Sequence, residues 1–394
     1  MPKRSVTETE VRGKRALVRV DFNVPLRGGD VADDTRIRAA LPTIRYLLDQ
    51  GAAVVLATHL GRPKGKADSA YSVAPVAQRL SELLGQRVAT VSVVAGPEAE
   101  RAVTALRPGD VLLLENTRFE PGEEANDPEL ATSLARLCDL FVNDAFGAAH
   151  RAHASTVGVA DVLPSCSGLL LQREEAVLSR LLNDPERPFI AVLGGAKVSD
   201  KFGVLEHLLG RVDALLLGGG MANTMLLAQG HQVGSSLAEP DRVDDARRLL
   251  ESAEAREVLI LVPTDVVTAR SLDSTNPTVT ATDAIPADEA IFDIGPATVA
   301  RYCEQIAAAR TVFWNGPMGV FERKQFENGT IGIARCVADA SAYTVVGGGD
   351  SLAAIDAAGV GERIDHISTG GGASLEYLEG RELPGIAALP DASA

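Results

Sequence analysis

Short apolar runs recur along the whole chain, and each ends in a polar or glycine-rich turn that leads into a helical stretch. A run that is apolar at nearly every position suits a strand buried on both faces, as in a parallel sheet covered by helices on both sides. The runs are residues 16–20, 53–57, 88–94, 111–114 and 140–142 in the first half, and residues 189–193, 214–217, 258–262, 311–314, 343–346 and 366–367 in the second half. The pattern therefore predicts an α/β fold with two doubly wound, Rossmann-like domains.

The length of the chain and a proline-containing turn predict where the domains divide. The chain has 394 residues, more than one compact core of ordinary size holds. A helical stretch at residues 174–182 and a proline-containing turn at residues 183–188 precede the second group of strands. We expect four parts: an N-terminal domain over residues 1–170, an interdomain hinge helix over residues 171–187, a C-terminal domain over residues 188–372, and a final segment over residues 373–394 that returns towards the first domain.

Composition excludes several classes of protein. The net charge of -15 argues against nucleic-acid binding through the general surface, because phosphate contacts need clustered Lys and Arg. No apolar run approaches the ~20 residues that span a bilayer, and the start of the chain does not read as a signal peptide, so we expect a cytoplasmic protein. The cysteines Cys138, Cys166, Cys303 and Cys336 form no CxxC pair, and we expect buried free thiols rather than a metal site or a disulfide framework.

Cationic and amide side chains are concentrated in the turns of the first half. Ligands of open parallel sheets bind at the carboxyl ends of the strands, so these turns are candidates for a binding site. The candidate anion clamp consists of Arg36, His59, Arg62, Arg118, His150 and Arg151. Arginine presents a planar fork to a carboxylate or phosphate, although any one of these residues could be an ordinary surface residue. The pair His150 and His153 could suggest a metal site, but no carboxylate pattern accompanies it.

Glycines dominate the turns of the second half. Triple-glycine runs at residues 218–220, 347–349 and 370–372 follow apolar runs and open into helical stretches. A turn without Cβ atoms lets backbone N–H groups approach a phosphate, and a helix N-terminus favours its negative charge. Each run could instead serve only a tight connection from strand to helix. Three such runs in one half favour a phosphate site.

Two lysines and one aspartate add to this second group. Lys197 and Lys201 follow a glycine pair, and their spacing of four predicts one face of a helix. The two cations could hold phosphate oxygens, although a solvated lysine pair would give the same pattern. Asp350 could cap the helix after the second triple glycine, or it could bind Mg²⁺ together with nucleotide phosphates.

Several known signatures are absent from the sequence. Residues 61–66 resemble a P-loop, but the glycine spacing is one residue short and Ala67 stands where Ser or Thr is required. The absence of GxGxxG argues against a nicotinamide-dependent dehydrogenase, and the protein-kinase signatures are missing too. A two-lobed binding protein without catalysis would share the predicted fold, but two separate cationic phosphate sites exceed what one ligand needs.

Ordered segments along essentially the whole chain resemble the phosphoglycerate kinase family. The first half contributes VDFNVPL (20–26), THLGRP (58–63), LENTRF (114–119) and VNDAFGAAHRAHAS (142–155). The second half contributes LGGAKVSDK (193–201), LGGGMAN (217–223), DIGP (293–296), WNGPMGVFE (314–322), VGGGDS (346–351) and STGGGAS (368–374). The one departure from the family pattern is Ala148, where threonine is expected.

The resemblance implies reversible phosphoryl transfer from 1,3-bisphosphoglycerate to ADP in glycolysis, giving 3-phosphoglycerate and ATP. By analogy, the first domain binds the glycerate through Asp21, Asn23, Arg36, His59, Leu60, Gly61, Arg62, Arg118 and Arg151. The second domain binds the nucleotide with Mg²⁺ through Gly194, Gly195, Lys197, Lys201, Asn315, Glu322, Gly348, Gly349, Asp350 and Ser351, with Asp350 at the metal and Glu322 at the ribose. The resemblance also implies a monomer, and the composition argues against a nucleic-acid or membrane partner.

This reaction needs no general base, because the acceptor carboxylate is already ionised at neutral pH. Catalysis is then positioning and neutralisation of charge on the transferred phosphoryl group. We expect that role for Arg36, Lys197 and the backbone N–H groups of Gly349 and Gly372, together with Mg²⁺. Because the two ligands belong to different domains, in-line transfer also implies closure around a hinge at residues 168–188.

Overall fold

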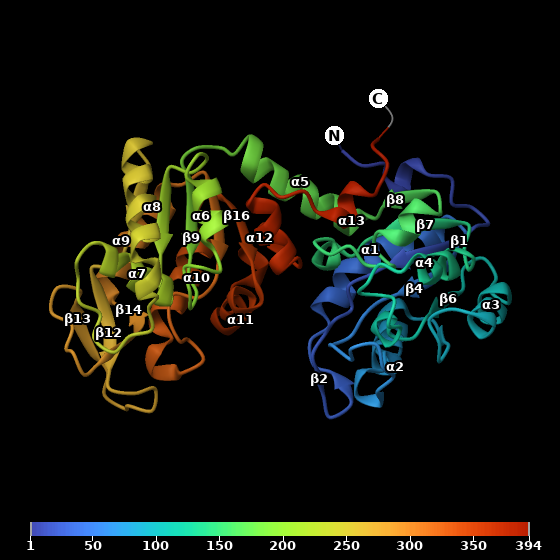
Figure 1. The fold of residues 1–394 in the computed structure, drawn as a ribbon, viewed down its shortest axis with the longest axis horizontal. Helices are drawn as coiled ribbons and strands as arrows, with labels where there is room; N and C mark the ends of the chain where they lie inside the picture. The colour runs from blue at the N-terminus through green and yellow to red at the C-terminus, as the bar shows by residue number, and fades with distance from the viewer. Residues whose placement is uncertain (1, 393–394) are drawn as a thin grey trace. The chain divides into compact units, whose positions relative to one another are not determined.

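The structure is a computed structural model that describes residues 2–392. These residues form two compact units (Figure 1). The first unit holds the chain up to Ala176 together with the stretch from Glu382 onward, and the second unit is Val177–Arg381. Each unit is built around a six-stranded parallel sheet, which confirms the predicted doubly wound α/β class. No helix among the described residues is both long and apolar enough to cross a membrane.

The sheet of the first unit has the strand order β5-β6-β4-β1-β7-β8. Its strands are β1 (Arg15–Arg19), β4 (Ala53–Ala57), β5 (Val88–Thr90), β6 (Val111–Leu113), β7 (Leu140–Asn143) and β8 (Ser165–Ser167). Its helices are α1 (Thr35–Asp49), α2 (Ala74–Leu84), α3 (Pro97–Thr104), α4 (Pro128–Ala135) and α13 (Pro384–Ala387), and β2 (Leu26–Arg27) pairs with β3 (Asp30–Val31). Because later strands lie on both sides of β1, the turn after β1 sits at the centre of the sheet edge.

The core of the first unit is aliphatic. Every residue of β4 is buried, and Val54 and Leu56 pack in one cluster with Ile37 and Ile44 of α1. Helix α13 belongs to this unit. The Asn143 side chain donates a hydrogen bond to the Gly385 oxygen of this helix at 2.9 Å. The apolar runs of the sequence thus form the buried layer that holds the strand ends in place.

A buried carboxylate fixes the start of α5 (Leu169–Asn183). Asp144 Oδ1 accepts hydrogen bonds from the backbone N–H groups of Leu170 at 2.9 Å and Leu171 at 3.2 Å. Burial raises the pKa of Asp144 to about 7, against the effect of these hydrogen bonds. A Cβ atom at Gly168 would lie 2.2 Å from Asp144 Oδ1, so only glycine fits before the helix. The helix therefore begins earlier than the sequence predicts, since its first turn is capped by a residue distant in the chain.

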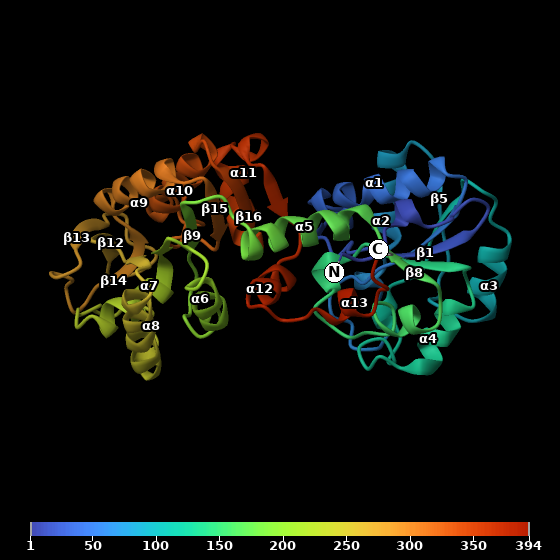
Figure 2. The same ribbon diagram turned by 90° about the horizontal axis from the view of Figure 1, so that it is seen from above.

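The sheet of the second unit has the order β11-β10-β9-β15-β16-β17. Its strands are β9 (Phe189–Leu193), β10 (Ala214–Leu217), β11 (Leu259–Leu261), β15 (Thr311–Asn315), β16 (Tyr343–Gly347) and β17 (His366–Ser368). Its helices are α6 (Phe202–Leu208), α7 (Gly219–Ala228), α8 (Val243–Ala255), α9 (Pro296–Ala308), α10 (Asn328–Asp339), α11 (Gly349–Ala358) and α12 (Gly372–Leu378). Helices α9, α10 and α11 cover one face and α6, α7 and α8 the other (Figure 2). The order of strands reverses between β9 and β15, which is where ligands bind in such sheets.

An antiparallel sheet of the second unit was not predicted. It consists of β12 (Asp265–Ala269), β13 (Thr278–Ala281) and β14 (Ala290–Ile294), in the order β13-β12-β14. These strands are only partly buried and carry threonine and aspartate, so they show no continuous apolar run.

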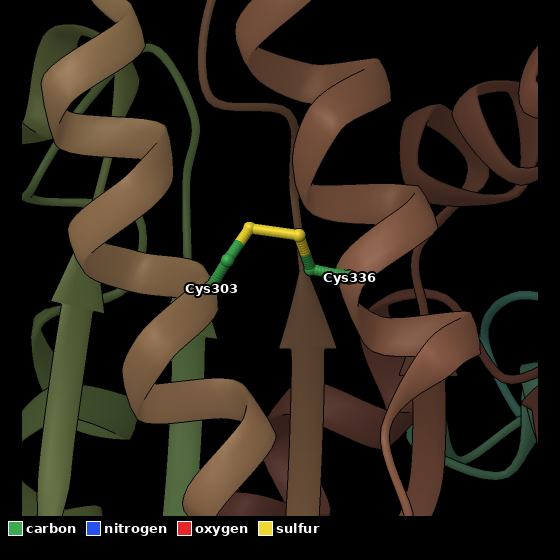
Figure 3. The surroundings of a disulfide bond; sticks show 2 residues. All are labelled: Cys303 and Cys336. Carbon is green, nitrogen blue, oxygen red and sulfur yellow. A yellow bond between two sulfur atoms is a disulfide. The ribbon is translucent and has the colours of Figure 1, made fainter.

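The prediction of four free cysteines is wrong for two of them. Cys303 of α9 and Cys336 of α10 form a disulfide, with their Cα atoms 5.5 Å apart (Figure 3). Cys138 and Cys166 are free and buried, as expected. The two bonded residues lie on neighbouring helices that flank β15, a proximity that the spacing in the sequence does not reveal.

Candidate functional site

The predicted site residues form two separate groups, one at the strand ends of each unit. In the first unit they follow β1, β4, β6 and β7, which are neighbours in the sheet. In the second unit they follow β9, β15 and β16, which are also neighbours. Because parallel strands point the same way, each group gathers at one edge of its sheet.

Arg36 of α1 reaches back to the turn after β1. Its Nη1 lies 3.2 Å from Asp21 Oδ2 and donates to the Asn23 main-chain oxygen at 3.1 Å. Asn23 in turn accepts, through Oδ1, a hydrogen bond from the Gly61 N–H at 2.9 Å. About a third of the Arg36 side chain remains exposed (33%), so the guanidinium is both anchored and accessible to a ligand.

The turn after β4 is held by residues that follow β6. Asn116 donates to the Leu60 oxygen at 2.7 Å and accepts from the Leu60 N–H at 3.3 Å. Arg118 donates to the Gly61 oxygen at 2.7 Å. Gly61 has a φ of +62°, and a Cβ there would lie 2.3 Å from the Tyr71 ring, so the turn requires glycine.

Charged groups of the first unit lie close enough together to affect one another's protonation. Burial lowers the pKa of Arg118, Glu124 opposes that effect, and Arg151 and Arg19 reinforce it. Glu124 lies 3.1 Å from Arg118 Nε. Arg36, Arg118 and Arg19 each have a carboxylate within 4 Å. Arg151 adds a further positive charge to the group, and this favours an anionic ligand.

His59 enters this group as a neutral ring rather than as a cation. Burial is the main reason that its pKa lies well below the usual value, and the nearby Arg19, Arg118, Arg36 and His153 lower it further. A neutral imidazole has one donor and one acceptor nitrogen. His59 can therefore donate one hydrogen bond to an anion but adds no charge.

The remaining predicted residues of the first unit differ in exposure. Arg62 and Arg151 are exposed, and Arg151 Nε donates to His150 Nε2 at 3.0 Å. His153 is buried, with Nδ1 3.8 Å from Glu123 Oε1, and its pKa is lowered to about 4, chiefly by burial. Among the residues that the structure describes, no group of three His, Cys, Asp or Glu side chains is placed to hold a metal ion.

Lys201 does not share a helix face with Lys197, and that prediction is wrong. The segment between β9 and α6 is a loop with a turn, and α6 begins only at Phe202. Lys201 turns inward and donates to the Gly194 oxygen at 2.6 Å and the Asn315 oxygen at 3.0 Å. Lys197 is exposed. The two cations thus have different environments, one tying loops together and one facing outward.

The three glycine runs serve different purposes. A Cβ at Gly219 would lie 2.5 Å from the Gly195 oxygen, and one at Gly220 would lie 2.2 Å from the Ala196 oxygen. The first run therefore allows the start of α7 to pack closely against the turn after β9, a role that the sequence did not predict. Gly349 and Gly372 have no atom within 4 Å of an added Cβ and begin α11 and α12. An added Cβ at the first residue of α11 or α12 would therefore point into open space.

Side chains after β15 and β16 complete the second group. Asn315 donates to the Gly347 oxygen at 2.9 Å, and the buried Ser351 hydroxyl accepts from the Gly316 N–H at 2.6 Å. Glu322 is exposed in the loop that follows β15. The hydrogen bonds of Asn315 and Ser351 thus join the end of β15 to the end of β16, where the second triple glycine begins.

Asp350 is not the cap of α11, since Gly348 occupies that position. Its carboxylate is exposed in the first turn of the helix. A single carboxylate beside an open glycine turn fits Mg²⁺, which binds through one or two carboxylates and completes its shell with phosphate oxygens and water.

Two important residues were missed, although the sequence held a signal for one of them. Arg19 lies inside the apolar run of β1 and is fully buried, and a charge in a buried strand requires a partner. Its partner, Glu123, is also fully buried and lies far away in the sequence. The presence of a buried charge was therefore readable, but the identity of its partner was not.

Comparison with known proteins places the chain among relatives of one kind. The family model described as phosphoglycerate kinase matches residues 6–381. Proteins named phosphoglycerate kinase from Chloroflexus aurantiacus and Roseiflexus sp. strain RS-1 are 58% and 57% identical to the chain, and each comparison covers 100% of both sequences. The relative from Thermomicrobium roseum is 56% identical over 98% of this chain and 99% of its own.

Solved structures with the same name are similar throughout. Phosphoglycerate kinase from Coxiella burnetii is 44% identical, with a TM-score of 0.89 over 98% of each chain. The enzyme from Pyrococcus horikoshii OT3 is 36% identical, with a TM-score of 0.88 over 99% of this chain and 98% of its own.

Proposed function

The chain belongs to the phosphoglycerate kinase family, and on this premise we propose how its two units divide the reaction between them. The reaction is the reversible glycolytic transfer of a phosphoryl group from 1,3-bisphosphoglycerate to ADP, which gives 3-phosphoglycerate and ATP. The first unit binds the glycerate, and the second unit binds the nucleotide as its Mg²⁺ complex.

The cations around the turn after β4 support the glycerate site. A molecule with a carboxylate and a phosphate suits Arg36, Arg118 and Arg151, with His59 as a neutral donor. Asp21, Asn23 and Asn116 hold the turn and Arg36 in place, and Leu60, Gly61 and Arg62 belong to the same turn. A strongly acidic chain with a local excess of arginine selects an anion by its field as well as by contact.

The open N-terminus of α11 supports the nucleotide site. Gly348, Gly349 and Ser351 lie where phosphate oxygens can approach backbone N–H groups. Lys201 and Asn315 join the neighbouring strand ends through hydrogen bonds. Gly194, Gly195 and Lys197 belong to the turn after β9, and Glu322 is assigned to the ribose hydroxyls. Bound Mg²⁺ would be held by Asp350 and would supply positive charge to the phosphates.

Transfer itself requires positioning and charge neutralisation, since the reacting carboxylate is already ionised. Arg36, Lys197 and the N–H groups of Gly349 and Gly372 take this role. Because the two ligands are assigned to different units, we also propose hinge closure when both are bound. On family membership alone, we propose that the protein acts as a cytoplasmic monomer.

The observation that carries the proposal is that arginines gather at the strand ends of one unit, whereas open glycine turns lie at the strand ends of the other. Calorimetric titration of two variants tests it. Arg118→Ala should weaken binding of 3-phosphoglycerate and leave Mg·ADP binding unchanged, and Asp350→Asn should do the reverse. Loss of both ligands in either variant, in a protein that still folds, would contradict the division.

A further inference from the structure

A fully buried arginine stands directly behind the proposed glycerate site. Arg19 is the last residue of β1, and its guanidinium is enclosed by Ser155, the Val20 oxygen and His59. We propose that Arg19 is a positioning residue that holds His59 neutral with its proton on Nε2, so that the imidazole donates to bound 3-phosphoglycerate. This inference rests on the proposed function and concerns a residue that does not touch the substrate.

The geometry fixes which nitrogen of His59 carries the proton. Arg19 Nη2 lies 3.2 Å from His59 Nδ1. A guanidinium can only donate, and it does not lose its proton in proteins. His59 Nδ1 must therefore accept with its lone pair, and the one proton of the neutral ring sits on Nε2. A protonated ring would place two donors against each other.

Arg19 is itself held rigidly, so it imposes an orientation on His59. Its Nε donates to Ser155 Oγ at 2.7 Å, and its Nη1 donates to the Val20 oxygen. Ser155 donates to Glu123, through its N–H at 3.0 Å and through its hydroxyl. Glu123 Oε1 lies 3.9 Å from Arg19 Nη2 and balances the buried charge. Both groups are fully buried, so this arrangement is shielded from solvent.

The basic groups around His59 all lower its pKa. Besides burial, the groups that lower its pKa are Arg19, Arg118, Arg36 and His153. Glu123, the carboxylate of this network, contacts Arg19, Ser155 and His153 instead. His59 thus stays neutral among cations, and it can offer a directional hydrogen bond that adds no further charge to the site.

The first test reads the tautomer directly. Long-range ¹H–¹⁵N spectra of the full-length protein should show His59 neutral with its proton on Nε2 between about pH 5.5 and 8, without titration. In Arg19→Met, the pKa of His59 should rise and protonation should appear in that range. A proton on Nδ1 in the unmodified protein, or an unchanged His59 in Arg19→Met, would overturn the inference.

The second test measures the consequence for the substrate. Loss of a hydrogen bond to a charged acceptor predicts a rise of ~10- to 150-fold in KM for 3-phosphoglycerate in Arg19→Met, with KM for ATP unchanged. The matched control is Arg15→Met, because Arg15 lies on the same strand in an exposed pair with Asp139, and it should behave as the unmodified enzyme. Equal rises in both KM values, or no change, would count against a positioning role.

Two comparisons between further variants test for a simple folding defect. Arg19→Met leaves Glu123 buried without its counter-charge, so Arg19→Met/Glu123→Gln removes both charges and is compared with Glu123→Gln alone. His59→Gln keeps a side-chain donor that does not depend on a tautomer. In the His59→Gln background, Arg19→Met should cost little extra in KM, whereas the full extra cost would show that Arg19 acts through the fold alone.

The glycerate site and the role of Arg19 can be tested separately. If 3-phosphoglycerate leaves the His59 signals of the unmodified protein unchanged, the assignment of the glycerate site is wrong. If those signals shift with ligand but Arg19→Met changes neither the tautomer nor KM, only the role of Arg19 is wrong.

Discussion

The buried ammonium of Lys201 donates a hydrogen bond to the main-chain oxygen of Asn315 at 3.0 Å, and a second one to the side-chain oxygen of the same residue. A third hydrogen bond reaches the Gly194 oxygen at 2.6 Å. Lys201 thus joins the ends of β9 and β15 at the point where the strand order of the second unit reverses. One charge serves both the packing of the loops and the electrostatics of the proposed nucleotide site.

This burial predicts a pH dependence. Burial lowers the pKa of Lys201 to about 8, against the opposing effect of Asp350 and Asp200. The ammonium attracts an anionic nucleotide only while it is charged, so KM for ATP should rise as pH increases through about 8. Lys201→Arg keeps its charge and should show a flatter profile. If KM for ATP depends on pH in the same way in both proteins, the charge of Lys201 does not contribute to nucleotide binding.

The two side chains assigned to the transferred phosphoryl group should be costly to remove. Arg36→Ala and Lys197→Ala should each lower kcat by ~10²–10³, the usual loss for one preorganised electrostatic contact. Arg38 is the matched control, because it lies two positions further along α1, is exposed and pairs with Asp34 at 2.8 Å. Arg38→Ala should retain full activity. Near-normal kcat for either of the first two variants would remove that residue from the proposed mechanism.

Two glycines should respond in opposite ways to the same substitution. Gly219→Ala should destabilise the fold by ~2 kcal/mol or more, because its φ is +68° and the new Cβ meets the Gly195 oxygen. Gly349→Ala meets no protein atom, so its stability should be unchanged or slightly raised while kcat falls. Urea unfolding and steady-state kinetics separate the two effects. A stable Gly219→Ala protein would show that the loops are not tightly packed.

The bond between Cys303 and Cys336 should stabilise the second unit without affecting its chemistry. The cross-link spans 33 residues, and such loops contribute about 2–4 kcal/mol to the free energy of unfolding. A Cys303→Ser/Cys336→Ser protein should lose that amount in urea unfolding and should keep the KM values of the unmodified enzyme. Under reducing conditions the two proteins should unfold alike. Equal stability without reductant would argue that the bond does not form.

Strands buried on both faces could be located from the sequence. The bounds of β4, β9 and β10 agree with the predicted runs, because such strands appear as continuous apolar stretches. The strands β12 and β13 could not be found this way, since they are partly exposed and polar. The disulfide escaped prediction because it depends on two helices lying side by side.

The residues of the candidate site that could be predicted are those that directly follow a strand. Residues such as Asn23 and Asp350 stand just after strands, and ligands bind at the carboxyl ends of parallel strands. The inward turn of Lys201 could not be predicted, because it depends on the loop before α6. The network of Arg19 and Glu123 joins residues distant in the chain, so no local pattern marks it.

Mapping ligand contacts by NMR tests the central claim most directly. Added alone to the ¹⁵N-labelled protein, 3-phosphoglycerate should shift the backbone amides of Asn23 and Gly61 in the first unit. Mg·ADP added alone should shift the amides of Gly349 and Ser351 in the second unit. Shifts from both ligands in one and the same unit would contradict the proposed division of the site.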